Sequence, residues 1–523
     1  MLRIASLLLA LFAAVPVSSA RLSAVVEPVV LDQKSDLETL KDVTKIPGQR
    51  IVAARQLANA MGPKIADEFL DLGPKATTTP DLRVQLANLL ADMKDPGVDK
   101  KIVSKLKDGS ADEKIFHLRA TKNIADAKLT KQICDQCIAF MNDKDAELRG
   151  MAVDILIQRE YVDAIPALEK LLKKEADFAT IGTAMAGITK LQQKGMKGLP
   201  EWETKLKDFT VHESPFFRNA ALEELGKIGK AEFVDLVAAQ LKSKDWSTRI
   251  SALLALEKIR NKAGIPLIIA QMKSETGRPL EEFAAALERM TGTPLGTDVP
   301  RWEEWWRNKG ADFQFAATAE RPSTEGPAAK KSHFGETKVE FLGIPVTSRR
   351  IIFIVDISGS MKELARGILK NDTDVGGGTM TRIDVVKREL NACIDKLEPE
   401  ALFNVVVFNE SVFTWLNSGM AKMGKKTRED GKAYVASREA AGGTNLYDAI
   451  KTAFQDPDCD TIYILSDGQP TAGEQTDPAT IRADVAKWNA TRHIKIHTIA
   501  VGEQLDLLTA IAIDSGGEHV EYK

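Results

Sequence analysis

Oxygen-bearing side chains follow an apolar segment in the stretch IIFIVDISGSM, residues 351–361. Asp356, Ser358 and Ser360 alternate directly after five apolar residues. Alternation along an extended turn places the three side chains on one side of the backbone. Three oxygens on one side can converge on one hard cation. The stretch therefore predicts part of a metal site at the end of a buried strand.

Two later segments supply further oxygens. Thr444 stands in GGTNLYD, just before a predicted helix, and Asp467 ends the predicted strand in IYILSDGQPT. The two glycines before Thr444 allow a close backbone approach. A ligand set of oxygens alone suits Mg²⁺, Ca²⁺ or Mn²⁺ and not zinc. Two aspartates balance a dication, so one position on the metal stays open to a partner carboxylate.

The elements that position these residues alternate between strand and helix over residues 339–523. We expect strands in 349–355, 401–408, 411–415, 460–468, 493–502 and 518–522, and helices in 381–397, 445–454, 477–492 and 506–517. Thr381 and Asp384 offer a capping box at the first of these helices. Apolar strands separated by amphipathic helices indicate a mostly parallel sheet with helices on both faces. Ligands of such sheets bind at the carboxyl ends of the strands, where the five residues lie.

The order of these motifs, DxSxS, a glycine-preceded threonine and SDG at a strand end, resembles the von Willebrand factor type A domain. The resemblance covers residues 339–523 and includes the metal-ion-dependent adhesion site of that family. It implies a Rossmann-like α/β fold in which Ser358, Ser360 and Thr444 hold the ion with Asp356 and Asp467, the aspartates often through water. One departure is the insert at 361–380, which could form a lid or contribute to selectivity.

The first half of the chain repeats. Arginine recurs at Arg50, Arg83, Arg149, Arg218 and Arg249, at intervals of 33, 66, 69 and 31 residues. A unit of about 33 residues accounts for all four intervals, with degenerate copies near Phe116, Thr183 and Phe283. Two antiparallel helices per unit predict a curved, all-α solenoid over residues 35–310. The arginines are expected to fix helix packing or to pair with the acidic residue just before them.

The rhythm of DAELRGMAVDIL and ESPFFRNAALEEL resembles short-type HEAT repeats. HEAT arrays are usually protein-binding scaffolds, so the resemblance implies a second binding surface; some short-type arrays are bilin lyases. Trp302, Trp305 and Trp306 lie on one face of a helix near the end of the array. A terminal helix that closes the array is favoured over a carbohydrate platform. Residues 311–338 have the composition of a flexible linker.

Residues 1–20 read as an export signal, with Arg3 before a short apolar core and Ser18 and Ala20 before a cleavage point. A retained anchor is the alternative. We expect an exported protein, periplasmic, extracellular or on the cell surface, with no transmembrane segment after signal cleavage. The whole architecture resembles exported bacterial chains that join HEAT-like repeats to a von Willebrand factor type A domain.

Composition and motifs exclude several functions. The chain has 71 basic and 74 acidic residues without a long basic block, so nucleic acid is not expected as a partner. No G-x-S-x-G, HExxH or P-loop motif occurs, which argues against an enzyme. His493 and His497 lie in or beside a predicted strand, where alternation puts both on one face, and this is more typical of a strand face than of a ligand set.

The four cysteines are too few for a disulfide framework. Cys134 and Cys137, in CDQC, are expected to be two buried side chains, with a local disulfide or half a metal site as alternatives. Cys393 and Cys459 are expected in the core.

The function that the sequence favours is divalent-cation-dependent protein binding. Mg²⁺, or Ca²⁺ or Mn²⁺, would be held by Asp356, Ser358, Ser360, Thr444 and Asp467 and would coordinate a partner Glu or Asp. The alternatives are a structural adaptor whose metal only stabilises loops, and a HEAT-type, lyase-like enzyme.

Overall fold

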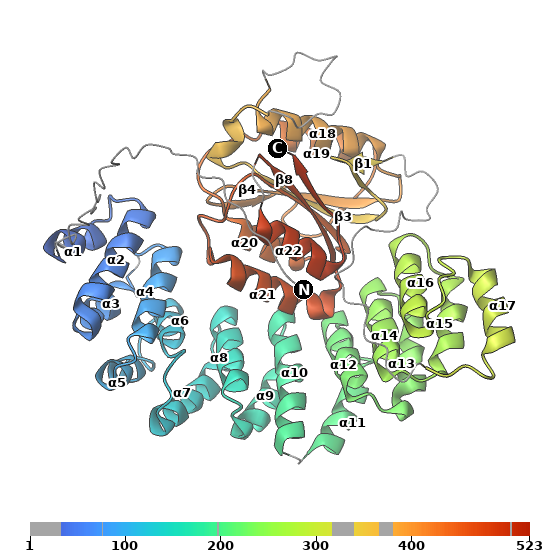
Figure 1. Ribbon diagram of the computed structural model, residues 1–523, viewed down its shortest axis with the longest axis horizontal. Helices are drawn as coiled ribbons and strands as arrows, with labels where there is room; N and C mark the ends of the chain where they lie inside the picture. The colour runs from blue at the N-terminus through green and yellow to red at the C-terminus, as the bar shows by residue number, and fades with distance from the viewer. Residues whose placement is uncertain are drawn as a thin grey trace, which may run out of the picture.

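The computed structural model describes residues 33–75, 77–195, 198–315, 339–365, 380–502 and 505–522. Within these ranges, a helical array is followed by an α/β domain with a mostly parallel sheet (Figure 1). This is the fold class that the sequence predicts. The expected export signal lies outside the described residues, as do positions 316–338 of the expected linker and 366–379 of the insert.

Paired helices form the array, which curves into an arc (Figure 1). The helices on the concave side are α2 (Pro47–Met61), α4 (Pro80–Asp92), α6 (Ala111–Ala120), α8 (Ala146–Gln158), α10 (Phe178–Gly195), α12 (Pro215–Ile228), α14 (Trp246–Ile259) and α16 (Arg278–Thr291). Their convex partners are α3 (Ala66–Leu72), α5 (Pro96–Ser104), α7 (Ala127–Phe140), α9 (Ile165–Leu172), α11 (Leu199–Phe209), α13 (Val234–Ala239), α15 (Gly264–Met272) and α17 (Val299–Lys309). Helix α1 (Gln33–Lys41) precedes them.

The recurring position of the sequence falls on the concave helices. Arg50 lies in α2, Arg149 in α8 and Arg249 in α14, and the degenerate copies Phe116 and Phe283 lie in α6 and α16. One apolar core runs the length of the array, from Leu40 to Trp302. Each pair therefore buries its apolar side against its neighbours, which confirms the repeat of about 33 residues.

The recurring arginines connect successive repeats. Arg149 donates to both carboxylate oxygens of Glu175, at 2.6 and 2.7 Å, and to the carbonyls of Asp143 and Lys144. Arg249 pairs with Glu275 in the same bidentate way, at 2.7 and 3.0 Å. The expected pairing with the acidic residue just before the arginine is wrong, because the partner lies 26 residues later, in the turn that leads to the next concave helix. The expectation that the arginines fix helix packing is confirmed.

Helix α17 packs on the end of the array. The Asp298 carboxylate caps it by accepting from the Arg301 backbone N–H at 3.2 Å. The Trp302 side chain is fully buried and donates to the Gly296 carbonyl at 2.7 Å, while Trp305 and Trp306 pack partly buried against the same core. The burial of Trp302 fits a closing helix.

Among the described residues, we find no helix that combines the length and the apolar character of a membrane span.

The α/β domain begins with a small antiparallel pair, β1 (Glu340–Phe341) and β2 (Ile344–Pro345). Within the described residues, the main sheet has seven strands in the order β5-β4-β3-β7-β8-β9, with β6 also paired to β4. Its strands are β3 (Arg350–Asp356), β4 (Leu402–Phe408), β5 (Val412–Thr414), β6 (Ala421–Lys422), β7 (Thr461–Ser466), β8 (Lys495–Val501) and β9 (His519–Tyr522). Strands β4, β3, β7, β8 and β9 pair with one another in parallel. Strands β5 and β6 run antiparallel to β4.

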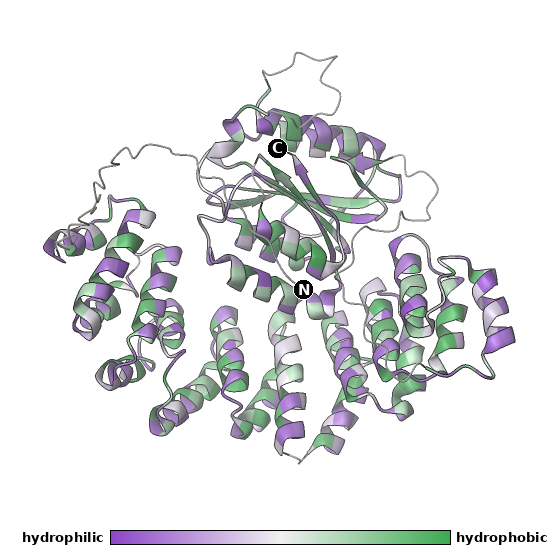
Figure 2. Cartoon of the chain, viewed as in Figure 1, coloured by the Kyte–Doolittle hydropathy of each residue, from purple (hydrophilic) through white to green (hydrophobic). Residues whose placement is uncertain are grey.

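Helices cover both faces of this sheet. They are α18 (Arg382–Lys396) and α19 (Lys425–Ala436) on one face, and α20 (Leu446–Phe454), α21 (Pro478–Arg492) and α22 (Asp506–Ser515) on the other (Figure 1). Along β3, Phe353 and Val355 join the core under α18, whereas Ile352 and Ile354 join the core under α20 and α21. Burial on both faces explains why the central strands are mostly hydrophobic (Figure 2).

The sequence predictions hold for most elements of this domain. Thr381 and Asp384 form the expected capping box at α18. Helix α19 was not predicted, because KKTREDGKAYVA is mostly polar and buries little more than Gly431 and Val435.

The α/β domain rests on the concave side of the array. Helix α21 packs against α10, α12 and α14. Phe178 of α10 belongs to the core of the α/β domain, where it stacks on Phe454 with ring centroids 6.4 Å apart. The Arg492 guanidinium lies 5.6 Å from the Phe178 ring and 5.4 Å from the Phe216 ring. The two halves therefore share an apolar interface.

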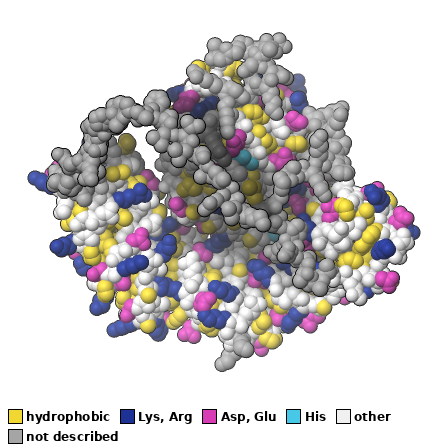
Figure 3. Space-filling model, in the orientation of Figure 1, with side chains coloured by type: hydrophobic (Ala, Val, Ile, Leu, Met, Phe, Trp, Pro, Cys, Tyr) yellow, Lys and Arg dark blue, Asp and Glu magenta, His cyan; other side chains and the backbone are white. Residues whose placement is uncertain are grey.

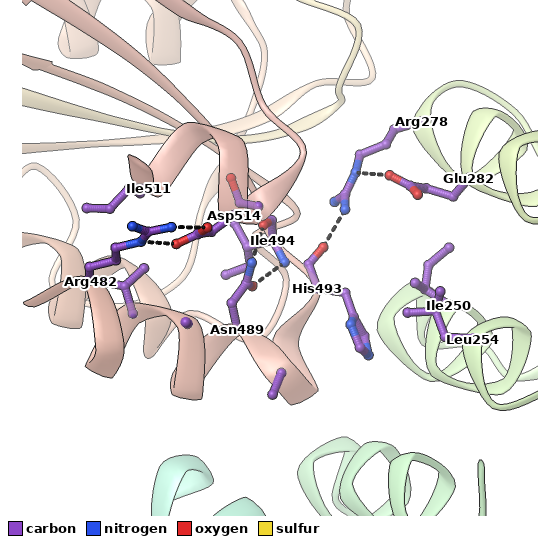
Figure 4. Close-up of a pocket in the computed structure, with 14 residues that line it drawn as sticks. Ile250, Leu254, Arg278, Glu282, Arg482, Asn489, His493, Ile494, Ile511 and Asp514 are labelled. Atoms are coloured by element: carbon purple, nitrogen blue, oxygen red, sulfur yellow. Dashed lines mark hydrogen bonds and ion pairs between the residues drawn. The ribbon is translucent and has the colours of Figure 1, made fainter. Parts of the chain in front are cut away.

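Polar contacts extend this interface toward the end of the array. Asn219 donates to the Thr491 carbonyl at 3.1 Å, and Ser251 Oγ lies 2.9 Å from His493 Nε2. The Arg278 guanidinium donates to the carbonyls of Asp460 and His493. These contacts border a cavity of about 260 Å³ between α14, α16, α21 and α22 (Figure 4). Because these donors and acceptors pair across the interface, the array fixes the orientation of the α/β domain.

Candidate metal centre

Asp356 ends strand β3 at the carboxyl edge of the sheet. Its side chain is fully buried and accepts from the Ser358 backbone N–H at 2.7 Å and from the Ser466 hydroxyl at 2.5 Å. Strands β3 and β7 pair in parallel with Val355 opposite Leu465, so Ser466 and Asp467 follow directly beside Asp356. Burial raises the pKa of the Asp356 carboxyl to about 6, although hydrogen bonds from Ser466 and Ser358 lower it.

The two serine hydroxyls connect Asp356 to Asp467. Ser358 Oγ lies 3.1 Å from Ser360 Oγ, and Ser360 Oγ donates to Asp467 Oδ1 at 2.7 Å. Ser358 is extended, and Ser360 lies in the 3₁₀ turn Gly359–Lys362 that follows it. Ser358 and Asp467 are 1 % and 3 % exposed, which leaves Ser360 as the more accessible hydroxyl.

The loop that carries Thr444 reaches the same place through the backbone of Gly442. The Gly359 N–H donates to the Gly442 carbonyl at 2.9 Å, which joins the loop before Thr444 to the loop of the two serines. A Cβ on Gly468, next to Asp467, would lie 3.8 Å from the Thr444 hydroxyl oxygen. Gly442 has a φ of 80°, and a Cβ there would overlap the Glu410 carboxylate, so only glycine fits. The structure therefore gathers all five predicted residues at one edge of the sheet.

Arg382 is a site residue that the sequence analysis missed. Its guanidinium donates to Asp467 Oδ2 at 2.8 Å and lies 3.0 Å from the Glu363 carboxylate. Gly502 has a φ of 93°, and a Cβ on it would overlap this guanidinium. One signal was present in the sequence. A cation at the first position of a helix opposes the helix dipole, so Arg382 needed an acidic partner from elsewhere.

The ends of the 361–380 insert are joined at the site. Leu364 and Thr381 form an isolated antiparallel bridge, and the Ala365 N–H donates to the Met380 carbonyl at 3.0 Å. The Arg382 N–H also donates to the Glu363 carbonyl, at 2.8 Å. The insert thus leaves and rejoins the domain next to Ser360.

The donor set fits a hard cation. Two buried carboxylates and three hydroxyls offer oxygen alone, and Arg382 supplies one positive charge against two negative ones. In the part of the chain that the structure describes, no three His, Cys, Asp or Glu side chains come together as metal ligands. A zinc-type cluster is therefore not found there. The candidate site differs from such a cluster because three of its five ligands are hydroxyl oxygens.

The histidines and cysteines stand apart from this site. His493 ends α21 with a φ of 55° and faces Ser251 of the array, while His497 stacks on Tyr463 in the sheet with ring centroids 4.8 Å apart. The prediction that both lie on one strand face is wrong, because the strand begins only after His493. All four cysteines are buried and free, so the expected core role is confirmed and the disulfide alternative is not.

Two family models match parts of the chain. The model described as the von Willebrand factor type A domain matches residues 373–519, and the model described as HEAT repeats matches residues 201–288. The α/β domain has the von Willebrand factor type A (VWA) fold, and the array is HEAT-like. The match to the VWA model includes Thr444 and Asp467 but begins after Ser360.

Relatives resemble the VWA domain. Inter-alpha-trypsin inhibitor heavy chain H4 of Homo sapiens is 25 % identical over 189 residues, which cover 34 % of this chain and 18 % of that protein. Heavy chain H2 of Mesocricetus auratus is 29 % identical over 170 residues, covering 30 % and 16 %. The von Willebrand factor A domain-containing protein 3B of Homo sapiens is 27 % identical over 184 residues, covering 33 % and 13 %. The chain thus spans less than a fifth of the length of each relative.

A solved von Willebrand factor type A structure from Catenulispora acidiphila is 20 % identical and covers 34 % of this chain and 39 % of its own. Its TM-score of 0.27 is too low to add to the fold assignment.

Proposed function

We propose that the protein binds a partner protein through a divalent cation at the VWA domain. The observation that supports this proposal is the gathering of two buried carboxylates and three hydroxyls at the carboxyl edge of the sheet. Asp356, Ser358, Ser360, Thr444 and Asp467 would hold Mg²⁺, or Ca²⁺ or Mn²⁺. The bound ion would supply an electrophilic position for a Glu or Asp of the partner.

The residues of the chain have distinct roles in this proposal. Asp356 is held by Ser466 and by the Ser358 backbone N–H, so its carboxylate cannot turn away from the site. Arg382 fixes one oxygen of Asp467 and leaves the other toward Ser360. The neutral hydroxyls add ligands without adding negative charge, which keeps the ion attractive to a carboxylate.

Calorimetric titration of the full chain with Mg²⁺, Mn²⁺ and Ca²⁺ tests the metal site. Asp356→Ala should abolish binding, because it removes one of two charged ligands. Asp395→Ala is the matched control, since Asp395 is a half-exposed aspartate of α18 that pairs with Lys432. Equal metal affinity in the wild-type chain and in Asp356→Ala would refute the proposal.

A structural adaptor is the second candidate, and the docked domains favour it. The array holds the VWA domain by an interface with buried contacts at Phe178 and Arg278, as a fixed scaffold would require. In an adaptor the metal stabilises loops only. A partner that binds Asp356→Ala as tightly as the wild-type chain would support the adaptor over metal-dependent binding.

We also propose that the protein is exported. The support is the signal-like sequence of residues 1–20, with a short apolar core before Ser18 and Ala20. Mass spectrometry of the N-terminus in the native host tests it, and a protein that begins at Met1 in the cytoplasm would contradict it.

A further inference from the structure

A cleft of about 1260 Å³ separates the N-terminal arm of the array from the VWA domain. We call it the arm cleft. Helices α2, α4, α6 and α8 and the start of α10 line one wall, and α20, residues 474–477 and α21 line the other. In Figure 1 the arm lies on the left, on the same side as α20. The volume exceeds the 300–1,000 Å³ typical of small-molecule sites, so the arm cleft has room for a polypeptide segment.

The arm cleft and the candidate metal centre are linked along the chain by two short connections. Thr444 directly precedes the Asn445 cap of α20, and Tyr447 and Lys451 of that helix line the cleft. The loop after β7 provides a second link. Its residue Thr471 donates its N–H to the Thr444 carbonyl and accepts from the Thr444 N–H with its hydroxyl, both at 2.9 Å. Three residues later, Glu474 lines the cleft. A chain bound at the metal therefore meets the cleft within one or two helical turns.

Both signs of charge line the cleft walls, and three ion pairs join them. Lys487 of α21 bonds Asp154 of α8 at 2.6 Å, and Lys451 bonds Glu474 at 2.7 Å. The lining has six Lys or Arg residues and seven Asp or Glu residues. Figure 3 shows the two signs interspersed over the visible face of the arm, with no block of one sign. A strongly charged ligand such as a nucleic acid does not fit these walls.

The negative charges of two cleft carboxylates are only weakly balanced by nearby cations. Asp484 accepts from the Tyr447 hydroxyl at 2.9 Å, and Glu147 meets Arg119 at 3.3 Å. Burial and the charge of Glu474 raise the pKa of Glu147, although Arg119 and Lys451 lower it. Burial and the charge of Asp154 raise the pKa of Asp484, although the Tyr447 hydroxyl, Lys487 and Arg119 lower it. A basic side chain from a ligand would relieve this excess of negative charge.

We infer that the arm cleft binds an extended segment of the partner protein, with its acidic residue at the metal and a basic residue near Asp484 and Glu147. This inference rests on the proposed function. Tyr447, the partner of Asp484, lies three residues into α20 from Thr444, about 5 Å along the helix. Extended chain rises about 3.3 Å per residue, and the tyrosine side chain adds its own length, so the two ligand residues stand roughly three to five positions apart.

Peptide selection on the full chain tests the inference. The probe is a display library of random peptides about 16 residues long, which reach about 50 Å when extended, selected in the presence of Mg²⁺. Selected peptides should carry an acidic and a basic residue at the stated separation. They should bind the wild-type chain at least tenfold more tightly than the double variant Glu147→Gln, Asp484→Asn.

The controls separate the inference from the proposed function. The double variant should keep the Mg²⁺ affinity and the melting temperature of the wild-type chain, and Asp395→Asn should keep the peptide affinity. Peptides that need Mg²⁺ but bind the double variant equally well would refute the inference about the arm cleft and would still support the metal site. Peptides that bind regardless of EDTA and of Asp356→Ala overturn the proposed function.

Two other outcomes also count against the inference. A library without any binder contradicts a cleft built for an extended segment. Self-association that the double variant abolishes, measured by light scattering, would identify a second copy of the chain as the occupant.

Discussion

The two ends of the HEAT-like array meet the VWA domain differently. Helices α10, α12 and α14 contact α21 directly, with Phe178 in the core of the domain and Asn219 bonded to the Thr491 carbonyl. Helices α2 to α8 face the domain across the arm cleft, where Lys487 and Asp154 make a salt bridge. The contrast shows how one repeated unit serves two purposes. Apolar and polar side chains of α10, α12 and α14 fix the domain, whereas the concave face of α2 to α8 borders an open cleft.

The largest effect is expected at the contacting end. Phe178→Ala should lower the free energy of unfolding by about 3 kcal/mol, because it removes a buried ring that packs on Phe454 and under Arg492. Thermal denaturation measures this loss, and small-angle scattering should show a larger radius of gyration. Phe69→Ala, buried within the array alone, should lower stability without expanding the molecule. Equal expansion in both variants would contradict the docking role of Phe178.

Within the array, a connection between repeats is expected to contribute about as much to stability. Arg149→Ala should lower the free energy of unfolding by about 3 kcal/mol, because it leaves the buried Glu175 carboxylate without its cation. A double-mutant cycle with Glu175→Gln isolates the pair. Adding Glu175→Gln should recover part of the loss, whereas simple additivity of the two changes would show that the pair does not couple the repeats.

A smaller effect is expected at the metal centre. Arg382→Gln should raise Mg²⁺ affinity about tenfold, because the guanidinium on Asp467 repels a second cation at that carboxylate. Calorimetry measures the change, and Arg388→Gln on the same helix, where Arg388 pairs with Glu389, should leave the affinity unchanged. Weaker binding in Arg382→Gln would mean that the arginine mainly positions Asp467.

The smallest effect concerns pH at the domain interface. Burial lowers the pKa of His493 from its usual 6.5 to about 4, with Lys258 and Arg278 lowering it and Glu223 and Glu282 opposing. A lowered folded-state pKa gives stability that is present above pH 6.5 and is lost as the pH falls toward 4. Hydrogen exchange in α21 should show that the free energy of opening falls by about 1 kcal/mol from pH 7 to pH 5, a value that allows for the partial exposure of His493.

His493→Gln provides the control for this effect. The glutamine amide can still meet Ser251 but does not titrate in this range, so the difference between pH 7 and pH 5 should shrink. An unchanged difference would assign the pH dependence to other groups.

The sequence predicts the fold because most elements, though not α19, have a clear hydrophobic period. The spacing of Arg50, Arg149 and Arg249 identifies the repeat, and the alternation of apolar strands with helices identifies the sheet. The five candidate metal residues follow from the same logic, since parallel strands bring their carboxyl ends to one edge.

Contacts between distant elements could not be predicted in this way. Arg278 donates to the carbonyls of Asp460 and His493, about 200 residues away. Every residue has a backbone carbonyl, so the residue types cannot reveal these acceptors. The pairing of each recurring arginine with the following repeat also depends on how the helices stack. Arg382 was overlooked because it begins a helix, whereas its partner Asp467 follows strand β7, 85 residues later.

The closure at the base of the insert has a consequence for how this domain can change. The bridge between Leu364 and Thr381 and the bond from Arg382 to the Glu363 carbonyl fix both ends of the segment. Since the entropy of closing a loop grows only slowly with its length, residues can be added or lost between these ends at little thermodynamic cost. Related chains can therefore differ widely in length at this point while keeping the candidate metal residues in place.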